Sequence, residues 1–231
     1  MNEQLLNLYK SKWPAVCAAM EPILADALFG IKPTCPLLLS VDDEEDFHSA
    51  DIRIMVYGQE TNNWYQQFNS DFEVVLEFYC RFFNQGEWLR TRGQFWRGFS
   101  RFLSLLQAKY PEKKVRVLWN NLVKIGKHEA KGFPPGYIYE VEKENFEVTA
   151  EELKIIKPNV ALFLSGPKYD GILLDKFGHL AKTAIEPFTE RQLARIELQG
   201  VDFAFRTYHP NYLWRNNIDR YFECIIAQIE I

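Results

Sequence analysis

Residues 51–64 read DIRIMVYGQETNNW, and this stretch decides the fold class of the chain. Residues 52–57 place β-branched side chains at alternate positions, which predicts a largely buried strand. Residues 59–63 follow without an apolar side chain and predict a polar turn. Ligands of open α/β sheets bind beyond the carboxyl ends of the strands, so this turn is a candidate site. The plainer interpretation is that Glu60 or Asn62 only caps the next helix.

Later segments repeat this pattern of an apolar strand followed by polar residues. Strands are expected at residues 115–120, 160–164 and 201–205, with a further one at 191–197. The polar residues that follow three of them are Asn120 and Asn121, then Ser165-Gly166-Pro167, then residues 207–211. If the strands are parallel, these turns line one edge of the sheet and form a single cleft.

Segments with the apolar periodicity of helices lie between the expected strands. Helices are expected at residues 3–29 (kinked or split at Pro14), 71–84, 91–110 and 216–228, and a short one begins at Thr149 with Glu152 as its capping box. Residues 37–39 are expected as a short strand or packing segment, and residues 42–46 and 126–136 as loops. Strands that alternate with helices predict an α/β fold with a central, mostly parallel sheet.

Composition limits the class of protein. A chain of 231 residues with 47% hydrophobic and 25% charged side chains suits one globular domain. The formal net charge of −4 argues against a nucleic-acid binder unless the basic residues are gathered locally. The aromatic share of 15% fits either a base-stacking surface or a large core.

The four cysteines are scattered, and no histidine stands at ligand spacing from them. We therefore expect reduced thiols, no metal site and no cofactor. No secretory signal and no apolar run of membrane-spanning length is visible, so the prediction is a cytoplasmic, monomeric protein without a membrane partner.

The polar turns, in their order along the chain, resemble the motifs of the uracil-DNA glycosylase superfamily. Residues 58–63, GQETNN, match a first motif of the form Gly-Gln-Asp-Pro-Tyr-His, and residues 118–120 match a strand that ends in a base-reading Asn. Residues 163–166 match an apolar strand with a small-residue turn, and residues 209–213, HPNYL, match the last motif, His-Pro-Ser-Pro-Leu. The resemblance covers roughly residues 50–215.

This resemblance implies a three-layer α/β/α sandwich with a short, mostly parallel central sheet. It implies one domain over residues 1–231, with residues 1–50 as a helical extension packed on it. The implied activity is that of a DNA glycosylase that flips a uracil or related damaged base and hydrolyses its N-glycosidic bond without a metal. DNA, single- or double-stranded, would be the partner.

The resemblance also implies roles for single residues. Glu60 would orient water and stabilise the oxocarbenium-like sugar, and His209 would hold the departing base as negative charge builds on it. The implied base-binding residues are Gln59, Asn62, Asn120, Trp64 and Phe72. The implied DNA-binding residues are Ser165, Gly166, Asn211, Leu213, Arg215 and Lys124, with Leu213 filling the vacated stack. Basic residues expected near the rim are Lys124, Lys127, Lys131, Lys168, Arg206 and Arg215.

The chain departs from the family at two motifs. Glu60 stands where the family has Asp or Asn, and Thr61 and Asn62 replace its Pro-Tyr pair. A longer carboxylate side chain changes the position of the charged group, to which rates are sensitive. Two alternatives therefore stay open: a catalytically inactive nucleic-acid or nucleotide-binding module on the same fold, and an enzyme acting on a free nucleoside or another small ligand. Each residue also has a plainer interpretation, as core, helix cap or strand-end hydrogen-bond partner.

Overall fold

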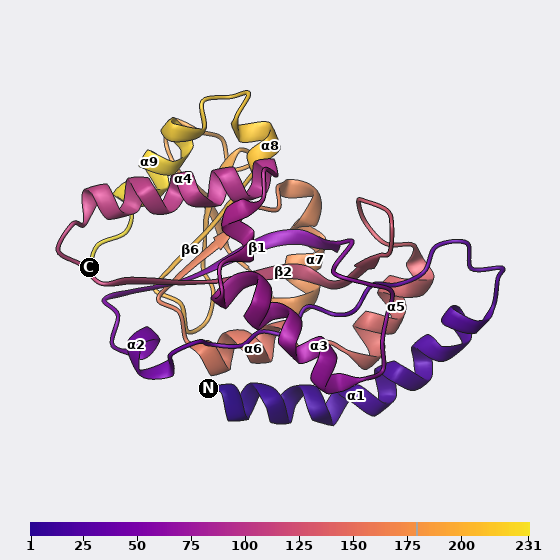
Figure 1. Cartoon of the computed structure of the whole chain (residues 1–231). Helices are drawn as coiled ribbons and strands as arrows, with labels where there is room; N and C mark the ends of the chain where they lie inside the picture. The colour runs from indigo at the N-terminus through magenta and orange to yellow at the C-terminus, as the bar shows by residue number, and fades with distance from the viewer. Residues whose placement is uncertain (179) are drawn as a thin grey trace. The chain divides into compact units, whose positions relative to one another are not determined.

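A computed structural model describes residues 1–178 and 180–231 (Figure 1). The fold is α/β, with a six-stranded mixed sheet flanked by helices and the strand order β2-β1-β3-β6-β5-β4. The chain divides into two compact units. Unit 1 comprises Met1–Asp42, Glu60–Gly86 and Asn121–Ile156, and unit 2 comprises Asp43–Gln59, Glu87–Asn120 and Lys157–Ile231. The single-domain interpretation stays a prediction.

The strands of the sheet are β1 (Ile52–Asn62), β2 (Val115–Lys127), β3 (Val160–Phe163), β4 (Lys182–Ala184), β5 (Leu193–Ile196) and β6 (Phe203–Thr207). β1 and β2 begin in unit 2 and end in unit 1, whereas the other four lie entirely in unit 2. All four residues of β3 are buried, as expected for a strand covered on both faces.

The expectation of a short, mostly parallel sheet is wrong. β1, β3 and β6 are parallel, but β5 pairs antiparallel with β6 and β4 pairs antiparallel with β5. The connections explain the difference, because the segment from β5 to β6 is a short turn through residues 197–202. A turn of that length joins antiparallel neighbours, whereas parallel neighbours need a crossover of a dozen or more residues.

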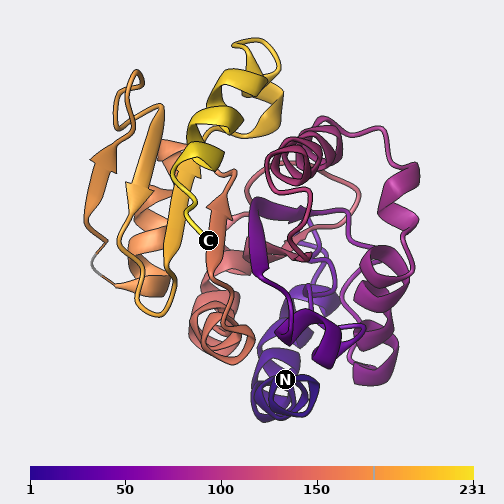
Figure 2. The same ribbon diagram turned by 90° about the vertical axis from the view of Figure 1, so that its left-hand side faces the viewer.

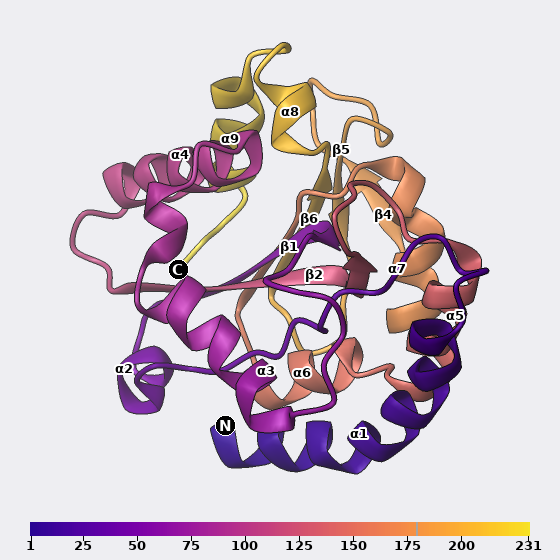
Figure 3. The same cartoon turned by 45° about the vertical axis from the view of Figure 1, so that its right-hand side comes forward.

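Unit 2 also holds α2 (Glu44–His48), η2 (Glu87–Arg90), α4 (Gln94–Lys109), η3 (Pro167–Tyr169), α7 (Asp170–Phe177), α8 (Pro210–Leu213) and α9 (Ile218–Ala227). Figure 2 shows α7 lying along one face of β4, β5 and β6. Phe177 of α7 packs on the stacked rings of Tyr57 and Phe163. Figure 3 shows α4, α8 and α9 grouped together. Phe102 of α4 packs edge-on against Phe222 of α9.

Unit 1 holds α1 (Asn2–Ala25), α3 (Phe72–Tyr79), the π-helix η1 (Cys80–Asn84), α5 (Gly136–Asn145) and α6 (Thr149–Ile156). Figure 1 shows α1 running along α5 and α6. Trp13 of α1 stacks on Phe68 and meets Phe72 and Phe146 edge-on, so α1 is fastened by aromatic packing.

The polar residues expected in turns after the first two strands lie within the strands, so that expectation is wrong. In unit 1, Thr61 Oγ1 donates a hydrogen bond to the Val123 carbonyl (3.0 Å), and Asn121 Nδ2 donates to Thr61 Oγ1 (3.2 Å). Polar side chains that satisfy one another in this way are compatible with a buried strand. Gly126 lets the strands approach closely, because a Cβ there would stand 1.4 Å from the Thr61 carbonyl oxygen.

Several local expectations also need correction. Residues 42–46 are not a loop, because Asp43 caps α2 by accepting the Asp46 N–H (2.8 Å). Residues 37–39 are the buried packing segment that was one of the two expected alternatives, and not a strand. The helix α1 is not split at Pro14 but continues through it. Part of the segment 126–136 is strand, and α5 begins at its end.

Glu152 does not form a capping box, because its carboxylate belongs to a buried polar network in unit 1. Lys124 Nζ lies 2.7 and 2.9 Å from the two Glu152 oxygens, and Tyr9 OH donates to Oε1 (2.6 Å). Tyr9 OH in turn accepts the Leu39 N–H (2.9 Å). Burial and the neighbouring Glu152 carboxylate raise the pKa of Tyr9, which keeps its hydroxyl a donor. The network joins α1, β2, α6 and the segment at Leu39.

We predict that Glu152→Gln lowers the free energy of unfolding by about 3 to 5 kcal/mol, because it leaves the fully buried Lys124 ammonium without a counter-charge. Denaturant titration measures the change. Glu151→Gln on the same helix is the control, since its ion pair with Lys154 is exposed and should cost less than about 1 kcal/mol. Equal losses in the two variants would contradict the prediction.

Candidate nucleic-acid-binding cleft

A cleft in unit 2 lies beyond the ends of its parallel strands. Tyr57 of β1, Phe163 of β3 and Arg206 of β6 are aligned across the sheet. Two residues beyond each of these three positions, the backbone reaches a residue that lines the cleft: Gln59, Ser165 and Tyr208. This is the position at which α/β sheets bind ligands.

Hydrogen bonds hold the strand ends together. Gln59 Nε2 donates to the Ser165 carbonyl (2.7 Å), and the Gly166 N–H donates to the Thr207 carbonyl (2.9 Å). The Leu164 N–H donates to the Tyr57 carbonyl (2.9 Å). These bonds extend the pairing of β1, β3 and β6 and set the walls of the cleft.

The cleft has a volume of about 290 Å³, close to the lower end of the range for small-molecule sites. Three cationic side chains line it: Lys168, Arg191 and Arg215. None of the described residues that line it carries a carboxylate. The local charge is therefore positive although the whole chain carries −4, and it favours an anionic ligand such as a phosphate.

Ser165 supplies a polar group that a ligand can satisfy. The residue is 1% exposed, and within the described part of the chain its Oγ has no hydrogen-bond partner. A buried hydroxyl without a partner costs free energy, so binding of a ligand that pairs with it is favoured.

His209 is held as a neutral hydrogen-bond donor. Its Nδ1 accepts the Asn211 N–H (3.1 Å), so the neutral imidazole carries its proton on Nε2. Burial lowers the pKa of His209 from 6.5 to about 4, and the ring is therefore uncharged at neutral pH. The Phe95 ring lies 5.8 Å from the imidazole and contributes to this apolar environment.

Six residues selected from the sequence line this one cleft: Gln59, Ser165, Gly166, His209, Asn211 and Arg215. Lys168, expected at the rim, lines it as well. Their motifs are far apart in the sequence, and the parallel pairing of β1, β3 and β6 brings them together.

Three other selected residues of unit 2 have structural roles. Asn120 is fully buried within β2, and its Nδ2 lies 3.7 Å from Met55 Sδ. Leu213 is fully buried in α8, so the expectation that it inserts into a DNA stack is wrong for this conformation. Arg206, expected at the rim, is 1% exposed and pairs with Asp170.

The remaining selected residues belong to unit 1. Glu60 is 8% exposed in β1, directly after Gln59 in the chain, and Asn62 Nδ2 donates to its backbone carbonyl (3.3 Å). Asn62 Oδ1 accepts the Gly132 N–H (2.9 Å), so this amide fastens the loop after β2. Lys124 is fully buried against Glu152, and the expectation of a phosphate contact is therefore wrong.

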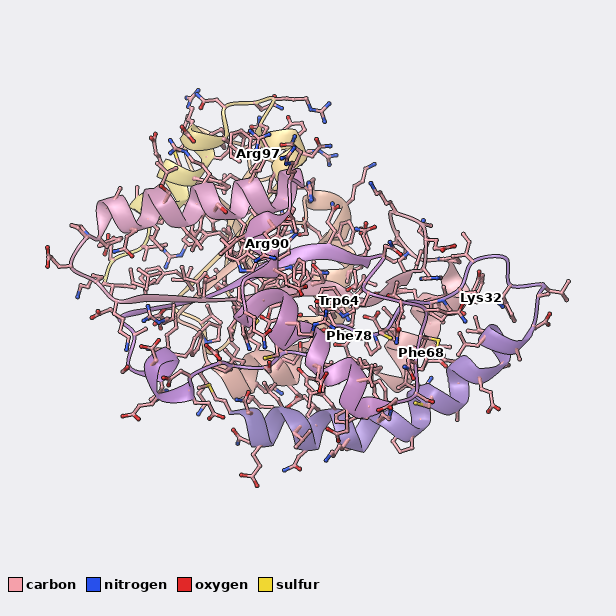
Figure 4. The ribbon with its side chains drawn as sticks, viewed as in Figure 1. Lys32, Trp64, Phe68, Phe78, Arg90 and Arg97 are labelled. Atoms are coloured by element: carbon pink, nitrogen blue, oxygen red, sulfur yellow. The ribbon has the colours of Figure 1, made fainter. Side chains whose placement is uncertain are left out.

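The two aromatic residues expected to stack on a base pack within unit 1. Trp64, labelled in Figure 4, is 5% exposed and meets Tyr65 and Phe82 edge-on. Phe72 meets Trp13 edge-on at 5.1 Å. Both rings therefore contribute to packing within unit 1, Trp64 as a buried and Phe72 as a half-buried side chain, and the base-stacking role stays a prediction.

The cleft also contains residues that sequence reasoning did not select. Tyr208 and Tyr212 line it with their rings 4.1 Å apart, and Tyr208 stands beside His209 in a motif that was visible. Arg191 stands in no motif that would mark it in the sequence. It reaches the cleft because β5, which begins two residues later, pairs antiparallel with β6.

Comparison of the sequence with protein-family models and with curated proteins gives no match. No helix among the described residues is long and apolar enough to cross a membrane.

We predict that Gly166→Ala lowers the free energy of unfolding by about 1 to 2 kcal/mol, because Gly166 has φ +78° and a Cβ there would lie 3.4 Å from Tyr208 Cδ1. Thermal unfolding monitored by circular dichroism measures it. Gly171→Ala on α7 is the matched control, since a Cβ there has open space and alanine favours a helix. A Gly166→Ala variant as stable as the Gly171→Ala variant would refute this account of the turn.

We predict that His209 makes the native state lose stability as pH falls from 6.5 to about 4. Over this range the unfolded chain binds a proton at the imidazole before the folded protein does, so the unfolded state is favoured. Urea unfolding of wild type and His209→Gln at several pH values should show a smaller loss in the variant. Identical pH dependence in both proteins would show that the imidazole is not held neutral.

Proposed function

We propose that the chain is a DNA glycosylase-like protein with the three-layer α/β/α architecture of the uracil-DNA glycosylase superfamily. It flips a uracil or related damaged base into the cleft and hydrolyses the N-glycosidic bond. The observation that carries this proposal is the half-buried, neutral His209 in a cation-lined cleft at the ends of parallel strands. The order of the sequence motifs supports it independently.

The chemistry needs a donor for the departing base. Cleavage of an N-glycosidic bond gathers negative charge on the base oxygen while the sugar becomes oxocarbenium-like. A neutral imidazole with its proton on Nε2 can donate a hydrogen bond to that oxygen, and the partly buried setting strengthens it. The apolar surroundings also keep the donor from being charged before the base arrives.

The surrounding polar groups suit the rest of a nucleotide. Lys168, Arg191 and Arg215 match the negative charge of backbone phosphates, and the Ser165 hydroxyl offers a buried hydrogen bond. Glu60 would stabilise the sugar cation and orient water. This role rests on its place in the first motif, directly after Gln59.

A second function is a nucleic-acid or nucleotide-binding module without hydrolysis. The specific observation in its favour is that none of the described cleft-lining residues carries a carboxylate. Glu60 does not line the cleft and is only 8% exposed. Without a carboxylate near the sugar, the cleft would bind a nucleotide but leave the oxocarbenium-like state unsupported.

We predict that wild-type protein releases uracil from an end-labelled oligonucleotide, detected as strand cleavage after alkali treatment. His209→Ala should slow release by about 100- to 1000-fold, as does the loss of one donor from other anion-stabilising sites. Glu60→Gln should abolish most of the activity if its carboxylate supports the sugar. Glu151→Gln, at an exposed position on α6, is the control and should cleave at the wild-type rate.

The outcome separates the two functions. Binding of the oligonucleotide without release of uracil, hypoxanthine or oxidised bases would favour the module. Neither binding nor cleavage by a folded wild-type protein would overturn both proposals.

A further inference from the structure

A second concave surface of unit 2 combines tryptophan with arginine. This surface, called the Trp-Arg groove here, is lined by Trp88, Trp96 and Trp214 together with Arg97 and Arg101, and its volume is about 390 Å³. Its residues come from η2, from the first turns of α4 and from the position after α8.

The rings of the groove are fixed in place but remain partly accessible. Trp88 lies 5.4 Å from Trp96, and the Arg97 guanidinium sits 5.1 Å above the Trp214 ring. Trp214 Nε1 donates to the Gln94 carbonyl (3.3 Å), which fixes the orientation of its ring. All three tryptophans are half-buried, and Leu89 at the rim is 69% exposed.

The charge of the groove favours an anionic partner. None of the described residues that line it is acidic. Arg101 is compensated by Asp219 at 2.7 Å, so Arg97 is the cation that the groove offers, and the exposed Arg90 and Arg92 precede it in the chain. Figure 4 shows Arg97 on α4 and Arg90 in the segment before this helix.

The groove lies next to the cleft, and aromatic contacts link the residues of the two sites. Phe95 lies 5.1 Å from Trp96 and 5.8 Å from the His209 imidazole, ring centre to ring centre. Trp214 in the groove is followed by Arg215 in the cleft. The groove and the cleft are therefore neighbours in unit 2, with Phe95 packed between Trp96 of the groove and His209 of the cleft.

We propose that the Trp-Arg groove binds single-stranded nucleic acid next to the nucleotide held in the cleft. Unpaired bases stack on the accessible faces of the tryptophans, while Arg97, Arg90 and Arg92 contact phosphates. Aromatic platforms combined with cations bind single strands without sequence preference, because every base has a stacking face. The bases of a duplex are stacked on one another and cannot stack on the tryptophans, so the groove selects single-stranded DNA. This inference rests on the proposed function, which supplies the nucleotide in the cleft.

The test is fluorescence anisotropy with labelled oligothymidylates that contain no uracil, at several salt concentrations and beside a duplex of the same length. We expect wild type to prefer the single strand and Trp214→Ala to weaken that binding about five-fold or more. Arg97→Gln should weaken it and reduce the slope of log affinity against log salt by about 0.7. The melting temperature of the Trp214→Ala variant checks that it is folded. Arg97 and Leu89 are exposed, so Arg97→Gln and Leu89→Ser change the groove without disturbing the core.

Arg195→Gln is the matched control, because the Arg195 guanidinium also lies over an aromatic ring, 5.6 Å from the centre of the half-buried Phe203 ring, in another part of unit 2. It should bind like wild type. If the Trp214, Arg97 and Leu89 variants bind like wild type while His209→Ala weakens binding, the groove proposal fails and the cleft proposal stands. Equal or tighter binding of duplex also overturns the groove proposal. Binding that depends on the groove residues but is not followed by base release would contradict only the proposed glycosylase activity.

Discussion

The cleft depends on one ion pair in unit 2, between a buried arginine and a half-buried aspartate. Arg206 in β6 is 1% exposed, and its guanidinium lies 2.9 and 3.1 Å from the two carboxylate oxygens of Asp170, the first residue of α7. It also donates to the Arg191 carbonyl (2.8 Å), and Lys182 reaches the same carboxylate (2.8 Å). Removal of one partner from such a group leaves an uncompensated charge in the interior.

The consequence of this pair for the cleft is positional. Residues 165–168 immediately precede Asp170, residues 208 and 209 follow β6, and Arg191 precedes β5. A single guanidinium therefore holds three chain segments that supply cleft residues. Because arginine presents its donors in a rigid planar fork, the pair restricts orientation as well as distance, which a lysine would not do.

Unit 1 uses the same physical principle for a different purpose. Lys124 and Glu152 are both fully buried, and Tyr9 completes the coordination of the carboxylate. No cleft described in unit 1 contains these three residues, and their hydrogen bonds are directed at one another. In one unit an ion pair positions a candidate site, and in the other a buried ion pair joins helices to a strand.

The charge distribution in unit 2 follows from the same placement. The acidic residues that give the chain its net charge of −4 are absent from the described linings of both the cleft and the Trp-Arg groove. Asp170 and Asp219 are each engaged by a neighbouring arginine. A chain with a net negative charge can therefore carry two hollows lined by cationic and aromatic side chains, and its net charge alone does not describe the local charge of either.

The sequence by itself determined the α/β class, the central apolar strands and most of the long helices, because these depend on the local period of apolar side chains. It also selected six of the residues that line the cleft, since polar groups after apolar strands are a local signal. It did not distinguish polar residues inside a strand from those after it. Thr61 and Asn121 satisfy each other across the chain, and only their long-range pairing makes a buried strand possible.

The tertiary structure alone decided which polar residues are structural. Lys124 and Arg206 read as surface cations, but both are buried, and each is paired with a carboxylate from a distant segment. Leu213 reads as an exposed apolar residue of the last motif, yet it is fully buried in α8. The antiparallel strands β4 and β5, the approach of Arg191 to the cleft and the gathering of three tryptophans into one groove likewise depend on contacts between distant segments, which no local pattern specifies.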